Sequence, residues 1–301
     1  MSTPLVNGLR SVAIGVPDVA AAVRFYVDTW HLAEVARDAR AVYLRGSGAD
    51  HHLLSVEQSP QPVVLAITLG APSRAAVDAL AERVPANGGT VLRAPAPQAD
   101  PAGGYGVVFR DPQGRILRAV SDGARHADAG PARDRPERLA HVVVNSRDVA
   151  AAQAFYEGAL GMKLSDRTRI MAFMRCNTDH HSIALADADN DCLNHIAFVM
   201  PGLDDVMRGG GRMKDAGYPI HWGPGRHGPG NNLFNYFLGP FGFPIEYTAE
   251  VSTVDDSYRV GRPEDWKWPP GRIDQWGIAV GPTPELKAAQ RAIGFAAQWT
   301  A

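Results

Sequence analysis

Two histidines and one glutamate stand on separate, strand-like and otherwise apolar stretches of this sequence. His141 lies in LAHVVVNS, His195 in CLNHIAFV and Glu246 in FGFPIEYT. Burying a lone carboxylate is costly unless a cation or hydrogen bonds compensate its charge. Two imidazoles and one carboxylate on separate core strands form the ligand set of a 2-His-1-carboxylate site, which leaves coordination positions open for reactants. We therefore predict that these three residues bind a divalent metal.

An internal repeat supports this prediction. Residues 9–26 (LRSVAIGVPDVAAAVRFY) match residues 139–156 (LAHVVVNSRDVAAAQAFY), and residues 109–120 match residues 237–248. A match of this length with single-residue gaps indicates a duplication. A single strand histidine is more often a core residue than a ligand, and for each histidine alone that alternative stays open. It is the joint pattern that favours a metal.

The two halves differ at the three positions of interest. In the alignment, Ser11 stands opposite His141, Ala66 opposite His195 and Arg118 opposite Glu246. The first half therefore has none of the three ligands, and we expect a metal site in the second half only.

Periodicity predicts that each half contains two βαβββ modules, in an α+β fold. In the second half Asp148 is a candidate helix N-cap after a strand at 139–145. Helices are expected at 19–30, 74–84, 148–160 and 203–216. Further strands of the second half are expected at 163–167, 170–176, 181–186, 192–199, 218–222, 233–238 and 243–248. The predicted domains are 1–122 and 137–250, joined by a linker at 123–136 and followed by a tail at 251–301.

Composition limits the classes of function. The net charge is −2, with no basic block and no acidic tail, which argues against a nucleic-acid or membrane-surface role. No apolar run approaches the roughly 20 residues that span a bilayer, and the N-terminus has no apolar signal core. The two cysteines, Cys176 and Cys192, are expected to be reduced thiols of a cytoplasmic protein.

The segment from Gly225 to Glu246, GRHGPGNNLFNYFLGPFGFPIE, carries a family resemblance. It resembles the signature of type I extradiol ring-cleavage dioxygenases, members of the vicinal-oxygen-chelate superfamily that also includes glyoxalases and bleomycin-resistance proteins. The matching positions are Gly225, His227, Tyr236, Pro240, Gly242 and Glu246. The chain departs from the signature at Asn235, which is usually apolar, and at Gly239, which is usually acidic or small and polar. The resemblance implies two tandem barrel-like domains over residues 1–250.

The resemblance also implies roles for individual residues. His141, His195 and Glu246 would hold Fe(II), with Mn(II) as a lesser possibility. His181 would be the acid–base histidine, and His227 and Tyr236 would donate hydrogen bonds to oxygens of the substrate. Imidazoles titrate near neutral pH, which suits removal of a proton from a catechol.

Alternatives for some of these residues stay open. His51 and His52 occupy the repeat position of His180 and His181 in the half without ligands, so a hydrogen-bonding role for the second pair is also consistent with the sequence. Trp266, Trp268 and Trp276 in the tail could form a lid or a subunit interface.

The predicted function is cleavage of a catecholic ring next to the diol with insertion of both atoms of O2, in the breakdown of aromatic compounds. An oxygen-independent, metal-dependent lyase, isomerase or thiol transferase of the same superfamily is the alternative. A drug-sequestering binding protein, which would carry no metal, is a third hypothesis. The expected partners are a catechol and O2, with no nucleic acid and no membrane, in a homo-oligomer by analogy.

Overall fold

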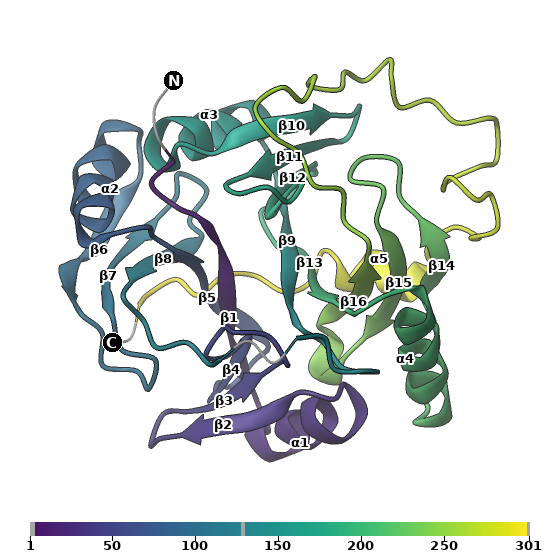
Figure 1. Ribbon diagram of the computed structural model, residues 1–301, viewed down its shortest axis with the longest axis horizontal. Helices are drawn as coiled ribbons and strands as arrows, with labels where there is room; N and C mark the ends of the chain where they lie inside the picture. The colour runs from purple at the N-terminus through teal and green to yellow at the C-terminus, as the bar shows by residue number, and fades with distance from the viewer. Residues whose placement is uncertain (1–3, 128–129, 300–301) are drawn as a thin grey trace.

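The computed structural model describes residues 4–127 and 130–299 and contains two eight-stranded sheets of the same topology (Figure 1). The strand orders are β2-β3-β4-β1-β5-β8-β7-β6 and β10-β11-β12-β9-β13-β16-β15-β14. Each sheet joins two βαβββ modules through antiparallel pairing of their first strands, β1 with β5 and β9 with β13. The prediction of an α+β fold with four such modules is confirmed.

The first half contains two modules. Their elements are β1 (Gly8–Val16), α1 (Val19–Arg24), the π-helical turn η1 (Phe25–Thr29), β2 (Ala33–Arg37), β3 (Ala41–Arg45), β4 (Leu54–Gln58), β5 (Val63–Gly70), α2 (Arg74–Ala86), β6 (Thr90–Pro97), β7 (Tyr105–Arg110) and β8 (Ile116–Ser121).

The second half repeats them. Its elements are β9 (Arg138–Ser146), α3 (Val149–Leu160), β10 (Lys163–Arg167), β11 (Met171–Arg175), β12 (Ile183–Asp187), β13 (Leu193–Val199), α4 (Leu203–Asp215), β14 (Trp222–Arg226), β15 (Leu233–Leu238), the 3-10 turn η2 (Pro240–Gly242) and β16 (Pro244–Ala249), and α5 (Pro284–Ala289) follows in the tail. No helix among the described residues is long and apolar enough to cross a membrane.

The duplicated sequence folds in the same local way in both halves. Asp18 and Asp148 are the N-caps of α1 and α3, and each carboxylate accepts a hydrogen bond from a backbone N–H in the first turn, that of Ala21 or Ala151. Such caps satisfy N–H groups that have no partner within the helix. The sequence DVAAA, in which the aspartate is the N-cap, therefore begins a helix directly after the first strand of each half.

Close packing against α4 explains two of its three consecutive glycines, which otherwise weaken a helix. A Cβ atom on Gly209 would lie 2.7 Å from the ring of Tyr247, and one on Gly210 would lie 2.5 Å from the amide of Asn235. The glycines thus allow α4 to approach β15 and β16, the strands that carry Tyr236 and Glu246. On β16, Tyr247 stacks on Trp30 of the first half at a centroid distance of 3.6 Å.

The tail connects both halves. In Figure 1 it runs from β16 around the second half and then returns to the first sheet. Phe295 forms a β-bridge with Val64 on β5, and the guanidinium carbon of Arg118 lies 5.6 Å from the ring centroid of Trp299. This return was not predicted.

One predicted strand is wrong. The sequence favours 218–222 as a strand, but β14 runs from Trp222 to Arg226 and pairs with β15. Gly223 and Pro224 indicate a turn, yet β14 is the last strand of its sheet, and an edge strand tolerates a proline that lacks an N–H. The predicted helix at 19–30 continues after Arg24 as the π-helical turn.

The domain boundaries at 122, 137 and 250 stay predictions. Residues 1–3, 128–129 and 300–301, which fall in the predicted first domain, linker and tail, lie outside the described residues.

Candidate metal centre

His141, His195 and Glu246 meet at the centre of the second sheet. The Nε2 atoms of the two histidines lie 3.3 Å apart, and Oε2 of Glu246 lies 3.2 Å from that of His141 and 3.1 Å from that of His195. All three residues are buried, and Glu246 is fully so. Within the described part of the chain, no other three His, Cys, Asp or Glu residues are grouped in this way.

The strand register brings these ligands together. Ala197 on β13 pairs with His141 on β9 and with Glu246 on β16. His195 lies two residues before Ala197 and reaches the same face, because side chains alternate along a strand. Three ligand atoms separated by 3.1–3.3 Å can all contact one cation at typical ligand distances of about 2.0–2.2 Å.

The electrostatics of the cluster fit a cation. Burial alone would raise the pKa of Glu246, but the adjacent His141 and His195 outweigh it, and the pKa lies well below its usual value. Burial lowers the pKa of His195 against the opposing effect of Glu246. Oε1 of Glu246 has no hydrogen-bond partner among the described residues. A buried carboxylate with a free oxygen and two imidazoles aimed at it is a donor set that suits a divalent metal.

A hydrogen-bond network orients His195. Its Nδ1 lies 2.8 Å from Oδ1 of Asn194, and the Nδ2 group of Asn194 donates to Asn145. Gln290 from the tail also donates to Asn194. When Nδ1–H of His195 donates to Asn194, Nε2 of His195 keeps the lone pair that a metal requires. The amide side chains therefore fix both the tautomer and the orientation of the His195 ring.

His181 lies against the metal cluster, while His180 points away from it. The ring centroid of His181 lies 4.3 Å from that of His141. Nδ1 of His181 lies 3.0 Å from Nδ1 of His180, and Nε2 of His180 lies 2.7 Å from Oδ2 of Asp166. Burial and the neighbouring histidines lower the pKa of His181 well below its usual value. Tyr258 of the tail donates to Asp166 from 3.3 Å.

This chain of contacts defines the tautomer of His181. With Nε2–H of His180 donating to the carboxylate of Asp166, Nδ1 of His180 is the acceptor in its contact with Nδ1 of His181. His181 then donates from its own Nδ1 and carries its lone pair on Nε2. In this form a histidine accepts a proton.

Tyr236 and His227 form a second polar pair beside the cluster. The hydroxyl of Tyr236 lies 3.1 Å from Nε2 of His227 and 3.5 Å from Nε2 of His195. Burial, followed by the nearby charge of Glu246, raises the pKa of Tyr236 well above its usual value, so the phenol remains protonated. Burial lowers the pKa of His227 to about 4, although its side chain is 21% exposed.

The tail covers the loop that follows His227. A Cβ atom on Gly228 would lie 2.6 Å from the ring of Trp268 and 3.1 Å from that of Trp266, so only glycine allows these rings to pack there. The side-chain amide of Gln275 donates to the backbone carbonyl of His227. The tail was predicted to form a lid or a subunit interface, and both stay predictions.

The structure thus brings all six predicted site residues together, and it adds others that sequence reasoning missed. These are Asp166, Asn194 and Gln290, together with Trp222, whose ring stacks on that of Tyr236 at 4.9 Å. The repeat contained one usable signal: Asp166 pairs with Phe173 as Ala36 pairs with Tyr43, so the carboxylate behind His180 is absent from the first half.

Known proteins resemble this chain along most of its length. The family model of the Glyoxalase/Bleomycin resistance protein/Dioxygenase superfamily matches residues 8–117 and 138–247. Metapyrocatechase 2 of Cupriavidus necator is 35% identical over 48% of this chain and 46% of its own length. The iron-dependent extradiol dioxygenase of Rhodococcus jostii is 26% identical over 59% of this chain and 65% of its own length. The chain therefore spans about half to two thirds of these curated relatives.

A solved structure matches more completely. The Mn(II)-bound glyoxalase from Novosphingobium aromaticivorans is 40% identical, with a TM-score of 0.87 and 94% of each chain covered.

Proposed function

The chain belongs to the Glyoxalase/Bleomycin resistance protein/Dioxygenase superfamily, and we propose that it is an extradiol dioxygenase of the type that cleaves a catecholic ring next to the diol. The observation that carries this proposal is the grouping of His141, His195 and Glu246 with two further polar pairs in one half of a duplication. The resemblance to Metapyrocatechase 2 and to the Rhodococcus jostii enzyme supports it.

Fe(II) is the proposed metal, held by His141, His195 and Glu246, and Mn(II) is the second choice, in line with the manganese-bound relative. When bound, such a metal would supply a Lewis acid for the two catechol oxygens and a path by which electrons pass from the catechol to O2. Asn194 keeps the His195 ring in the tautomer that leaves Nε2 free to bind.

The residues around the cluster handle protons. His181, with its lone pair on Nε2, would accept a proton that the catechol must lose and later return it. The neutral phenol of Tyr236 would donate a hydrogen bond to an oxygen of the substrate as negative charge develops there. His227, held neutral by burial, would orient the Tyr236 hydroxyl at 3.1 Å.

Oxygen consumption tests the proposal. Protein purified without air and loaded with Fe(II) would be assayed against a panel of catechols beside a His195→Ala variant. Uptake of O2 with a new yellow product, absent in the variant, is expected. Absence of uptake from protein that binds one metal per chain would contradict ring cleavage.

A second candidate function is metal-dependent chemistry without O2. The relative with 40% identity over 94% of both chains is named a glyoxalase, and this observation favours an isomerase or lyase of the superfamily. A glyoxalase assay under nitrogen separates the two functions, because a dioxygenase has no turnover without O2.

The partners of the enzyme follow from the same proposal. They are a catechol and O2, and we also propose that the protein forms a homo-oligomer in the cytoplasm. Light scattering during size-exclusion chromatography would give the number of subunits.

A further inference from the structure

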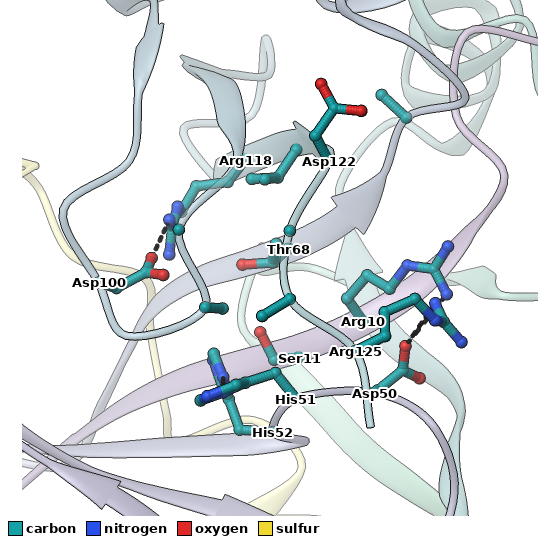
Figure 2. A pocket seen from close by; sticks show the side chains of 16 residues that line it. Arg10, Ser11, Asp50, His51, His52, Thr68, Asp100, Arg118, Asp122 and Arg125 are labelled. Carbon is teal, nitrogen blue, oxygen red and sulfur yellow. Dashed lines mark hydrogen bonds and ion pairs between the residues drawn. The ribbon is translucent and has the colours of Figure 1, made fainter. Parts of the chain in front are cut away.

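A polar chamber of about 240 Å³ lies in the first half of the chain (Figure 2). Strands β1, β5 and β8 contribute Ser11, Thr68 and Arg118, and the segment before β4 contributes His52. One buried water needs only about 10–15 Å³ of such space, so the chamber has room for a molecule larger than water.

The strand register places the polar side chains of the chamber in one row. Ser11 on β1 pairs with Thr68 on β5, and Thr68 pairs with Arg118 on β8. Directly paired residues point to the same face of a sheet, and Figure 2 shows these side chains around the same space. The row consists of two hydroxyl groups and one guanidinium, all of which donate hydrogen bonds.

The same row in the second half belongs to the metal centre. There His141, Ala197 and Glu246 occupy the three corresponding positions of β9, β13 and β16. Glu246 on β16 corresponds to Arg118 on β8, so the charge at this register position is reversed between the halves. The position of Glu246 suits a cation, and the position of Arg118 therefore suits an anion.

Two atoms of the chamber have unused hydrogen-bonding capacity. Thr68 is only 7% exposed, and its Oγ1 has no hydrogen-bond partner among the described residues. The same holds for Nε of Arg118. Leaving a buried polar group without a partner costs about 1–3 kcal/mol, and native structures contain few such groups. A bound ligand would provide the hydrogen-bond partner that each of these two atoms lacks.

Charges around the chamber favour a monoanion. Arg10 and Arg125 both pair with Asp50 at 3.1 Å, and Arg74 outside the chamber pairs with Asp122 at 2.8 Å. Arg118 contacts Asp100 through Nη2 only. The charged lining residues are Arg10, Asp50, Asp100, Arg118, Asp122 and Arg125, so three guanidinium groups face three carboxylates. Arg74 compensates Asp122 from outside the chamber, which leaves Arg118 able to receive a monoanion, while the carboxylates disfavour a dianion.

We propose that this chamber, defined by Ser11, His52, Thr68 and Arg118, binds the carboxylate of a small monocarboxylic acid. Arg118 would offer its Nε edge to one carboxylate oxygen, as charge-assisted hydrogen bonds of arginine to carboxylates are strong. Ser11 and Thr68 would donate from their hydroxyls. His52 pairs through Nδ1 with Nδ1 of His51 at 3.0 Å, which leaves its Nε2 for the ligand.

Titration calorimetry with the metal-loaded protein tests this inference. The probes are sodium acetate, propionate and benzoate at constant ionic strength, with sodium chloride and inorganic phosphate as comparison salts. Saturable binding of at least one carboxylate is expected, weakened at least tenfold by Arg118→Leu and several-fold by Thr68→Val. Thr68→Val removes no hydrogen bond within the protein, so the fold should be retained, and Thr90→Val on the exposed edge strand β6 is its matched control.

A His195→Ala sample separates this chamber from the metal centre. Carboxylate binding that persists in this variant supports the chamber, and binding that disappears assigns the carboxylate to the metal. The inference is also overturned by absence of saturable binding, by equal binding in Thr68→Val and Thr90→Val, or by phosphate binding as tightly as a monocarboxylate. 4-Bromobenzoate soaked into crystals would place the bromine in the chamber by its anomalous signal.

Discussion

Asp166 accepts a hydrogen bond from His180 at 2.7 Å while both side chains are shielded from solvent. His180 connects this carboxylate to His181, whose ring packs on the metal-ligand candidate His141. The first half contains the equivalent His51–His52 contact, also at 3.0 Å, but has Ala36 in place of the carboxylate. The paired histidines are thus a feature of the fold, and the carboxylate behind them belongs to one half only.

We therefore predict that Asp166→Asn lowers kcat by about 10- to 100-fold, the usual effect of removing a group that orients a metal-site residue. The amide no longer specifies which nitrogen of His180 carries the proton, so the tautomer of His181 is lost. Bound metal and KM should change little, since Asp166 touches neither metal ligand nor substrate. Asp187→Asn, which affects an exposed ion pair with Arg167, is the control. Equal kcat in the two variants would show that Asp166 has no positioning role.

Loss of one ligand should remove the metal. In His195→Ala and Glu246→Gln we expect metal content after purification to fall to background, and turnover with it, because two remaining ligands do not hold a divalent ion at a 2-His-1-carboxylate site. Elemental analysis of dialysed protein measures this. His52→Gln replaces a buried histidine of the first half and should retain the metal. A fully loaded His195→Ala protein would refute the proposed ligand set.

Arg115 forms a fully buried ion pair within the first half and also contacts the second half. It lies 2.7 Å from Asp111 and donates to the backbone carbonyl of Asn145 on β9 at 2.5 Å. Arg115→Met should lower the free energy of unfolding by about 3–5 kcal/mol, because it removes the cationic partner of a buried carboxylate. Urea denaturation measures this effect. Arg208→Met, at an exposed pair with Asp204, should cost far less, because exposed ion pairs contribute little to stability, and equal midpoints for both variants would contradict the prediction.

The sequence was sufficient to predict the module order, which the duplication displays twice, and to single out the three residues that the structure groups together, His141, His195 and Glu246. At a few positions the aligned halves differ in a charged or polar residue, for example Glu246 opposite Arg118. These differences indicated which half contains the candidate metal site. The register confirms this alignment.

Contacts made by distant segments were not predictable in this way. Asp166 lies in KLSDR, a polar strand at a sheet edge, and it is buried only because Tyr258 and Gly261 of the tail cover it. Likewise Trp299 reaches Arg118 across most of the chain length. The strand β14 was misplaced for a related reason: its pairing with β15 overrides the turn preference of Gly223 and Pro224.

The buried His52 should make stability depend on pH. Burial is the largest effect and lowers its pKa to about 4; His51 and Arg118 act in the same direction, while Asp100 opposes them. In the unfolded chain a histidine has a pKa near 6.5. Between about pH 6.5 and 4 the unfolded state therefore binds a proton that the folded state does not, and stability falls as the pH decreases through this window. The contribution is on the order of 3 kcal/mol.

His52→Gln should remove this contribution and flatten the dependence of unfolding free energy on pH over that window. Urea denaturation at a series of pH values measures the difference in unfolding free energy between wild type and His52→Gln. The two proteins share all other titrating groups, so this difference reports on His52. Thr68→Val changes the same chamber without a titrating group, so its curve should run parallel to that of the wild type. A difference between wild type and His52→Gln that stays constant from pH 6.5 to 4 would mean that His52 is protonated as readily in the folded protein as in the unfolded chain.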